Sequence, residues 1–166
     1  MTSAPRVIDT LRKADLLSGL NDDDLARVIA ICRAARVPAD RVIFNEGDTG
    51  DEMYIIHDGC VRVQIPTRTA DGGSVTSTIN TLYAGQCFGE VALLGGSARS
   101  ATVSALDITT LLVIREGDFR QLCEGDPRIG YRVIYNLARD LAYKLNSSNL
   151  LLRGNIRWRG DELGRR

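Results

Sequence analysis

The sequence predicts a mainly β fold, a jelly-roll-like barrel with flanking helices. Between residues 41 and 114, short runs rich in Val, Ile, Thr and Tyr are separated by Gly and Asp turns, which is typical of many short strands. Before and after this region, apolar residues recur at helical spacing. With 166 residues, of which 44% are hydrophobic, the chain is long enough for one core. We expect an N-terminal helical segment at 1–40, the barrel at 41–115, C-terminal helices at 116–152 and a basic tail at 153–166.

The N-terminal segment predicts two helices. Residues 7–13 fit a short first helix. Residues 21–24, Asn-Asp-Asp-Asp, provide an N-cap and an acidic first turn for a second, amphipathic helix over residues 25–35. Pro38 follows this run, and we expect it to end the helix.

Within the barrel region, glycines mark the expected turns. Gly47, Gly59 and Gly85 separate apolar runs, and we interpret them as turn residues without direct ligand contact. The polar stretch 67–77 is expected to be a hairpin tip and a tolerated loop insertion. His57 lies just before a turn, and a role in that turn is favoured over a catalytic one.

The C-terminal region predicts one long helix that begins near Pro127, a residue suited to a first helical turn. Apolar residues recur there at three- and four-residue steps: Ile134, Leu137, Leu141, Leu145 and Leu152. A helix of about 25 residues is about 38 Å long, more than a small barrel covers. We therefore expect a homodimer through this helix, the alternative being that it folds back on its own barrel.

Composition excludes several classes of function. The chain has 21 Lys and Arg residues and 21 Asp and Glu residues, so its formal net charge is zero. It therefore has no overall positive charge that would attract nucleic acid or an anionic membrane. No apolar run approaches membrane-spanning length, and we expect a cytoplasmic protein. The cysteines are scattered without a CxxC pair, which predicts reduced, packed thiols and no metal: Cys32, Cys60, Cys87 and Cys123.

The basic tail carries five Arg and the single Trp, Trp158. A basic segment with one aromatic could touch nucleic acid, but we favour a solvated or loosely docked C-terminus, since few charges bind weakly and in a salt-sensitive way. Nucleic acid is therefore an unlikely partner.

One segment combines the features of a receptor for a phosphorylated sugar. Gly89 permits close backbone approach, and the apolar run 91–94 predicts a short helical turn with outward N–H groups. Glu90 supplies acceptors suited to a sugar hydroxyl. Arg99, which the turn at residues 95–96 would bring back over the helix start, supplies a counter-charge for phosphate.

This sequence motif resembles the phosphate-binding cassette of the cyclic-nucleotide-binding domain family, which includes catabolite regulators, kinase regulatory subunits and gated channels. The matching residues are Phe88, Gly89, Glu90, Ala92, Arg99, Ser100, Ala101 and Thr102. Residues 44–48 and 53–59 resemble the family's strand and turn pattern, so the resemblance covers residues 16–150. Ala98 stands where several members have Pro, which puts affinity in doubt and leaves the class of ligand unaffected.

The resemblance implies a role for each residue of the cassette. Gly89 and Ala92 would offer backbone N–H groups to the cyclic phosphate, Arg99 would pair with it, and Glu90 would hold the ribose 2′-OH. Ser100 would bond phosphate or purine. The site also includes Phe88, Val91 and Ala101 of the cassette, Val63 and Leu82 as apolar walls of the base pocket, and Arg139, Asp140 and Tyr143 of the last helix as candidates to cap the base.

The expected function is a non-enzymatic, stand-alone receptor for cAMP, cGMP or both. Only 14 residues follow Leu152, too few for the winged-helix domain of the family's transcription regulators, so we expect regulation of an unknown effector in trans through the C-terminal helix. The alternative is a cassette-bearing interaction domain that has lost nucleotide binding. A DNA-binding regulator or an enzyme is a third, less favoured, possibility.

Overall fold

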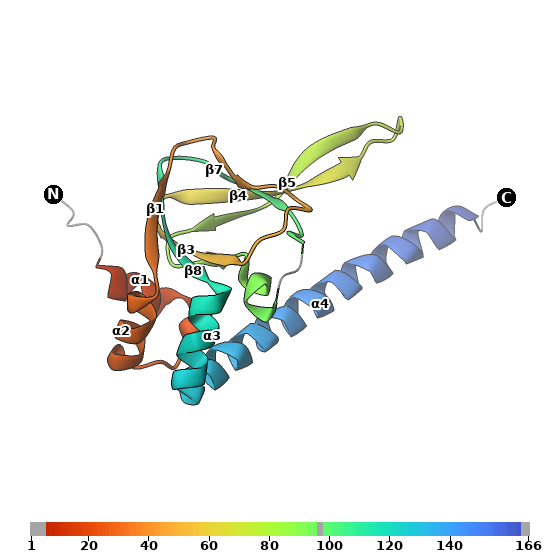
Figure 1. The fold of residues 1–166 in the computed structure, drawn as a ribbon. Helices are drawn as coiled ribbons and strands as arrows, with labels where there is room; N and C mark the ends of the chain where they lie inside the picture. The colour runs from red at the N-terminus through yellow and green to blue at the C-terminus, as the bar shows by residue number, and fades with distance from the viewer. Residues whose placement is uncertain (1–5, 96–97, 164–166) are drawn as a thin grey trace.

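The computed structural model describes the backbone of residues 6–95 and 98–163 and, within these ranges, the side chains up to residue 146. Two four-stranded antiparallel sheets face each other, and helices cover one end of this sandwich (Figure 1). The fold is the jelly-roll-like, mainly β architecture that the strand pattern predicts.

The first sheet has the strand order β1-β8-β3-β6, and the second has the order β2-β7-β4-β5. The strands of the first sheet are β1 (Arg33–Val37), β8 (Thr109–Arg115), β3 (Glu52–Asp58) and β6 (Cys87–Phe88). Those of the second are β2 (Val42–Phe44), β7 (Thr102–Ala105), β4 (Cys60–Arg68) and β5 (Ser74–Tyr83).

Three short helices precede the sandwich: α1 (Val7–Lys13), the 3₁₀ helix η1 (Asp15–Leu17) and α2 (Asp22–Ala30). A capping box starts α2, in which the Asp24 N–H donates to Asn21 Oδ1 at 2.9 Å and the Asn21 N–H donates to Asp24 Oδ2 at 3.1 Å. The prediction of a helix over 25–35 was wrong at its end. Residues 33–37 pair with β8 as a strand, because sheet pairing overrides the local helical preference.

Two other local predictions also need correction. The stretch 67–77 is mostly strand, since Thr67 pairs with Val75 and Ile65 pairs with Ser77, so the hairpin connection is only 69–73. His57 lies in β3 rather than in a turn, with its Nδ1 2.7 Å from Thr10 Oγ1 of α1. Gly47, Gly59 and Gly85 have the positive φ angles expected of turn residues.

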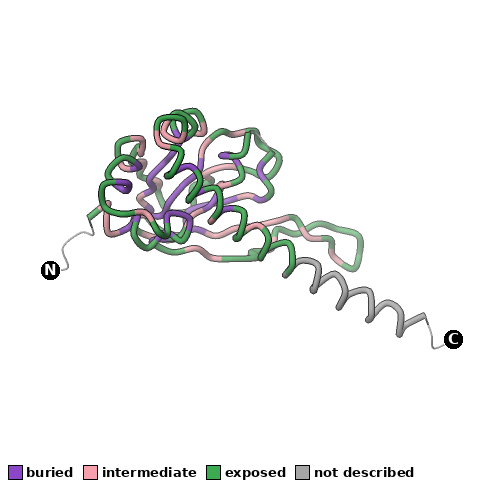
Figure 2. The backbone as a smooth tube through the Cα atoms, turned by 90° about the horizontal axis from the view of Figure 1, so that it is seen from below, coloured by how far each residue is buried: buried purple, intermediate pink, exposed green. Residues whose placement is uncertain are grey.

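Alternate residues of β3 contribute to two separate cores. Ile55 packs with the helices in an outer core that includes Leu25, Phe119 and Val133. Ile56 points the other way into an inner core between the sheets. The most deeply buried backbone therefore follows the sandwich and its adjoining helices, while the β4–β5 hairpin and the distal part of α4 that is described are exposed (Figure 2).

Two helices follow the last strand: α3 (Glu116–Gly125) and α4 (Pro127–Leu163). Pro127 begins α4 as predicted. The apolar seam is divided, because Leu137 is fully buried and Leu141 packs on the outer core, whereas Ile134 and Leu145 are exposed. The first part of α4 thus folds back on its own barrel. The side chain of Leu152 lies outside the described residues.

The backbone of α4 continues as helix through residues 153–163. The helix is therefore 37 residues long rather than about 25. The expectation of a solvated or loosely docked C-terminus stays a prediction, since the side chains of this segment lie outside the described residues. Among the described helices, none is long and apolar enough to cross a membrane.

Candidate functional site

The cassette begins where β6 ends. Gly89 adopts φ 70, and the 3₁₀ helix η2 (Glu90–Leu94) follows directly, which confirms the predicted helical turn. A Cβ at position 89 would lie 2.7 Å from Arg99 Nη1 and 3.2 Å from the Glu52 carbonyl oxygen. Glycine is therefore required here by both backbone conformation and space.

Backbone hydrogen bonds fix Arg99 against the loop after β2. The Arg99 N–H donates to the Asp48 carbonyl and the Gly47 N–H donates to the Arg99 carbonyl, both at 2.8 Å. The guanidinium reaches Gly89, whose carbonyl accepts from Nη1 at 3.5 Å. Arg99 thus returns to the start of η2 as the sequence predicts, although residues 96–97 of the connecting turn lie outside the described residues.

Aromatic rings surround the Arg99 guanidinium. Its Cζ lies 4.3 Å from the Phe44 ring centroid and 5.8 Å from that of Tyr54, and Tyr54 is stacked on Phe88 with centroids 4.9 Å apart. Arg99 is only 8% exposed, and its buried Nε has no hydrogen-bond partner. Within the described residues no carboxylate pairs with it, so the guanidinium suits an anionic ligand.

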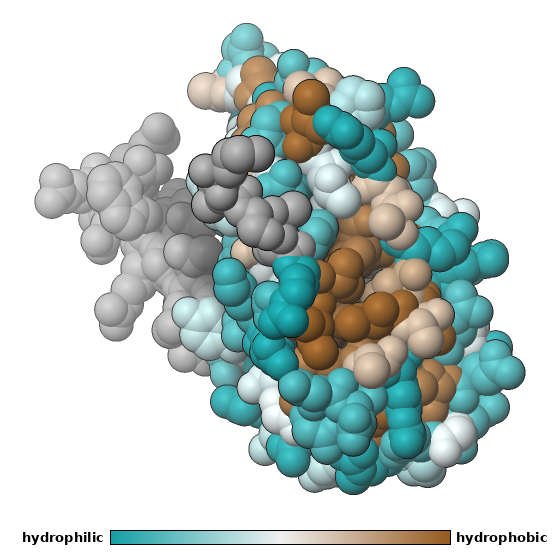
Figure 3. Space-filling view, turned by 90° about the vertical axis from the view of Figure 1, so that its left-hand side faces the viewer, coloured by the Kyte–Doolittle hydropathy of each residue, from teal (hydrophilic) through white to brown (hydrophobic). Residues whose placement is uncertain are grey.

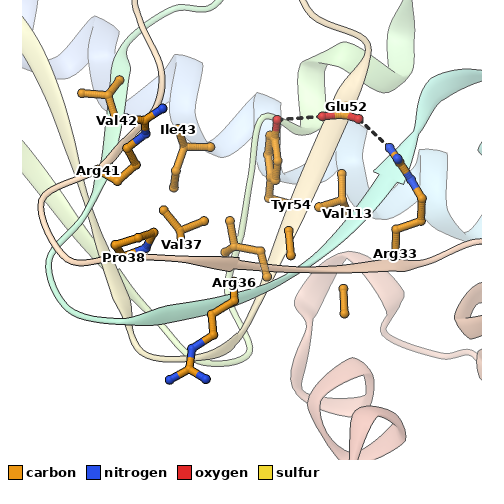
Figure 4. Close-up of a pocket in the computed structure, with 13 residues that line it drawn as sticks. Arg33, Arg36, Val37, Pro38, Arg41, Val42, Ile43, Glu52, Tyr54 and Val113 are labelled. Atoms are coloured by element: carbon orange, nitrogen blue, oxygen red, sulfur yellow. Dashed lines mark hydrogen bonds and ion pairs between the residues drawn. The ribbon is translucent and has the colours of Figure 1, made fainter.

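The Tyr54 side chain is held in place by a hydrogen bond at its hydroxyl. Its hydroxyl donates to Glu52 Oε2 at 3.0 Å, and Glu52 Oε1 accepts from Arg33 Nη2 at 2.7 Å (Figure 4). Burial, followed by the nearby Glu52 charge, raises the pKa of Tyr54 to about 12. The hydroxyl therefore stays protonated and keeps donating at neutral pH.

A separate cavity lies on this side of Tyr54. Seen from the side on which β1 lies in Figure 1, the surface is hollowed and apolar, with hydrophilic residues around it (Figure 3). The cavity is about 440 Å³ and is lined by β1, β2 and neighbouring strands. Arg36 points away from it (Figure 4), and Arg33 is engaged by Glu52. It contains none of the predicted site residues.

Ten of the thirteen predicted site residues line one pocket of about 460 Å³ between the second sheet and η2. They are Val63, Leu82, Phe88, Gly89, Glu90, Val91, Ala92, Arg99, Ser100 and Ala101. The structure modifies one expected role, because the Ala92 N–H donates to the Gly89 carbonyl at 3.1 Å. In the described chain no backbone carbonyl accepts from the N–H groups of Glu90 and Val91, which leaves these two for a ligand.

The three candidates from the last helix do not line this pocket. Tyr143 lines a neighbouring cavity of about 520 Å³, and the Arg139 guanidinium lies 6.0 Å from the Tyr135 ring centroid. Asp140 also lines the neighbouring cavity. The reason is helical phase, since consecutive residues on a helix point about 100° apart.

The α4 residue that does line the ligand pocket is Lys144, which sequence reasoning missed. Its Nζ lies 2.6 Å from Glu90 Oε1 and 2.7 Å from Asp140 Oδ2. Burial opposes the ammonium charge, but hydrogen bonds to Asp140 and Glu90 outweigh it and raise the pKa of Lys144. The sequence did contain one indication of this residue: Asp140 and Lys144 are four residues apart, a spacing that places opposite charges side by side on a helix. Phe44, Ile79 and Asn80 also line the pocket and were not predicted.

The cysteine thiols do not add chemistry to the site. Cys87 lines the pocket, but burial raises the pKa of its thiol to about 12, so it stays a neutral, weakly reactive group. All four cysteines are free. Within the described residues, no group of three or more His, Cys, Asp or Glu side chains could hold a metal ion.

A sequence model of the cyclic nucleotide-binding domain matches residues 34–126. This match covers nearly all of the sandwich, every lining residue of the pocket except Lys144, and α3, and the chain belongs to the cyclic nucleotide-binding domain family.

Individual relatives are of several kinds. The chain is 37% identical over 105 residues to a cyclic nucleotide-gated potassium channel of Mesorhizobium japonicum, covering 63% of this chain and 26% of the channel. It is 30% identical over 142 residues to the cyclic AMP receptor protein of Thermus thermophilus, covering 86% and 62%. The crystal structure of Thermus thermophilus catabolite activator protein superimposes with a TM-score of 0.73 and 29% identity, covering 84% and 62%. The chain thus spans less than two thirds of each relative's length.

Proposed function

We propose that this protein is a receptor for a purine cyclic nucleotide, cAMP or cGMP, and that it regulates an effector without catalysing a reaction. One observation carries the proposal: Arg99 is buried beside the η2 start with no carboxylate partner among the described residues and an orphaned Nε. Burying an unpaired guanidinium costs free energy unless an anion binds to it. Family membership indicates which anion that is.

The pocket offers matching partners for each part of such a ligand. Arg99 and the N–H groups of Glu90 and Val91 would bind the cyclic phosphate, and the Glu90 carboxylate would accept from the ribose 2′-OH. The walls include the side chains of Val63 and Leu82, which suit the apolar faces of a purine. No metal is needed for this mode of binding.

Signal output would pass through α3 and α4. Phe119 of α3 is buried in the outer core together with Leu93 of η2. A movement of the cassette would therefore be transmitted to the helices. The exposed apolar side chains of α4 favour a homodimer through this helix: Tyr131, Ile134, Tyr135, Tyr143 and Leu145. A cytoplasmic location, a stand-alone role and action on an unknown protein effector in trans stay predictions from the sequence.

Isothermal titration with cAMP and cGMP tests the function directly. Saturable binding of at least one of them, with one ligand per chain, is expected. Absence of heat with both, for a protein whose circular dichroism and thermal unfolding show a folded barrel, would favour the alternative of an interaction domain without nucleotide binding.

A further inference from the structure

Lys144 joins two parts of the molecule that are 54 residues apart in sequence. Its side chain leaves α4, lines the ligand pocket and ends 2.6 Å from Glu90 Oε1. Among the described residues of α4, Lys144 is the one that reaches this pocket. Asp140, one turn earlier on the same helix, holds the ammonium from the other side at 2.7 Å.

The contact with Lys144 engages only one of the two carboxylate oxygens of Glu90. Its side chain is 12% exposed, and Lys144 engages Oε1, while within the described chain no hydrogen bond is made to Oε2. A carboxylate has about four acceptor positions, so Lys144 and a ligand hydroxyl can bind Glu90 together. The ammonium fixes one oxygen and thereby aims the other.

The charge of Lys144 acts on the same carboxylate. Glu90 lines the same pocket as Arg99, so an uncompensated carboxylate would repel a phosphate bound there. The Lys144 ammonium, 2.6 Å from Glu90 Oε1, offsets part of that repulsion.

We infer that Lys144 is a positioning residue that orients Glu90 toward a sugar 2′-hydroxyl and so determines how strongly the protein selects a ribose over a 2′-deoxyribose cyclic nucleotide. The inference rests on the proposed function, because it assigns the reason for Glu90's orientation in that same pocket. It also makes α4 part of sugar recognition rather than only a cover for the base.

The test compares the dissociation constants of cAMP and 2′-deoxy-cAMP, measured by titration calorimetry on the full chain. Lys144→Met keeps the length of the side chain and removes the charge. We expect it to weaken cAMP binding by roughly three- to tenfold and 2′-deoxy-cAMP binding by much less, so that the preference for the ribose form falls. Lys144→Arg should retain most of that preference, since a guanidinium can still donate to Glu90.

Two controls separate positioning from general effects. Lys13→Met removes a lysine that lines the neighbouring cavity but not the ligand pocket, and it should leave both constants unchanged. In a Glu90→Gln background, Lys144→Met should have little further effect on the ribose preference, since the two residues act as a unit. Thermal unfolding of each variant verifies folding.

The outcomes are distinguishable. If the parent protein binds neither nucleotide, the proposed function itself fails. If the parent prefers cAMP and Lys144→Met keeps that preference, or weakens both ligands equally, Lys144 does not position Glu90 and the inference is overturned.

Discussion

Arg99 shows how a charged group can be kept ready for a ligand without an ion pair. Phe44 and Tyr54 face its guanidinium, and a cation over an aromatic face is attracted without being neutralised. A carboxylate in their place would have to be displaced by an incoming phosphate. The aromatic contact leaves the whole positive charge available.

Arg99→Ala should therefore weaken cyclic-nucleotide binding strongly. Loss of a charge-assisted, partly desolvated contact costs on the order of 2–4 kcal/mol, or roughly 30- to 1000-fold in affinity. Glu90→Ala should cost less. Arg36→Ala is the matched control, because Arg36 of β1 does not line the ligand pocket. Titration giving equal affinity for Arg99→Ala and the parent would refute the cassette assignment.

Ser100 concerns the choice of base. This residue lines the pocket, and in related members a hydroxyl there can accept from the guanine 2-amino group without excluding adenine. We expect both nucleotides to bind, with a preference under about tenfold, or 1.4 kcal/mol. Competition titration measures the ratio. Discrimination beyond about a hundredfold would mean that residues other than Ser100 set base specificity.

At the scale of elements, local signals predicted α1, the start of α2, η2 and the start of α4. Capping residues, Gly89 and Pro127 act within a few neighbouring residues, so their effects can be read along the chain. The strand β1 could not be predicted, because its partner β8 lies about 75 residues further along.

The sequence predicted that Gly89, Glu90 and Arg99 lie together, since they are close in sequence, and the structure places all three in one pocket. The residue that α4 contributes to the pocket was not predicted. Whether residue 143 or residue 144 reaches the pocket depends on the rotation of a helix that is connected through α3, and periodicity alone does not fix that rotation.

An ion pair between the buried Asp24 carboxylate of α2 and the largely exposed Arg128 side chain of α4 links the two helices. Asp24 has a 2% exposed side chain and accepts from Arg128 Nη1 at 2.8 Å. Hydrogen bonding to Arg128 lowers the pKa of Asp24 below its usual 3.8, although burial opposes this. Asp24→Asn should lower the free energy of unfolding by about 1–3 kcal/mol at neutral pH.

The pH dependence of that effect has a definite sign. Because the pKa of Asp24 is depressed in the folded state, its contribution is complete above about pH 4 and is lost as pH falls through the folded-state pKa. Urea unfolding at pH 7 and below pH 4 should show the difference between parent and Asp24→Asn shrinking in acid. A difference that stays constant with pH would contradict the ion pair.

The exposed apolar residues of α4 predict its oligomeric state. Ile134→Glu combined with Leu145→Glu should shift a dimer to monomers in sedimentation velocity, because charges would have to be buried in the helix contact. Val75→Glu changes an equally exposed apolar residue on the hairpin and should leave the dimer intact. If the parent is monomeric at concentrations of tens of micromolar, α4 does not form the proposed interface.

At the scale of the whole molecule, a ligand can change the output only if it binds two arrangements of the helices with different affinity. The Glu90–Lys144 contact and the packing of Phe119 near η2 give the cassette two separate routes to α4. We expect cAMP to increase hydrogen-exchange protection both in residues 88–103 and in residues 127–145. Protection confined to the cassette would show that α4 does not respond to the ligand.

The division of β3 between two cores has a mechanical consequence. Its even-numbered residues Tyr54 and Ile56 shape the interior that adjoins the ligand, while Met53 and Ile55 face the helices. Because the strand gives different residues to each core, a substitution at Ile55 should act first on the packing of the helices against the sheet, and a substitution at Ile56 first on the interior that adjoins the ligand.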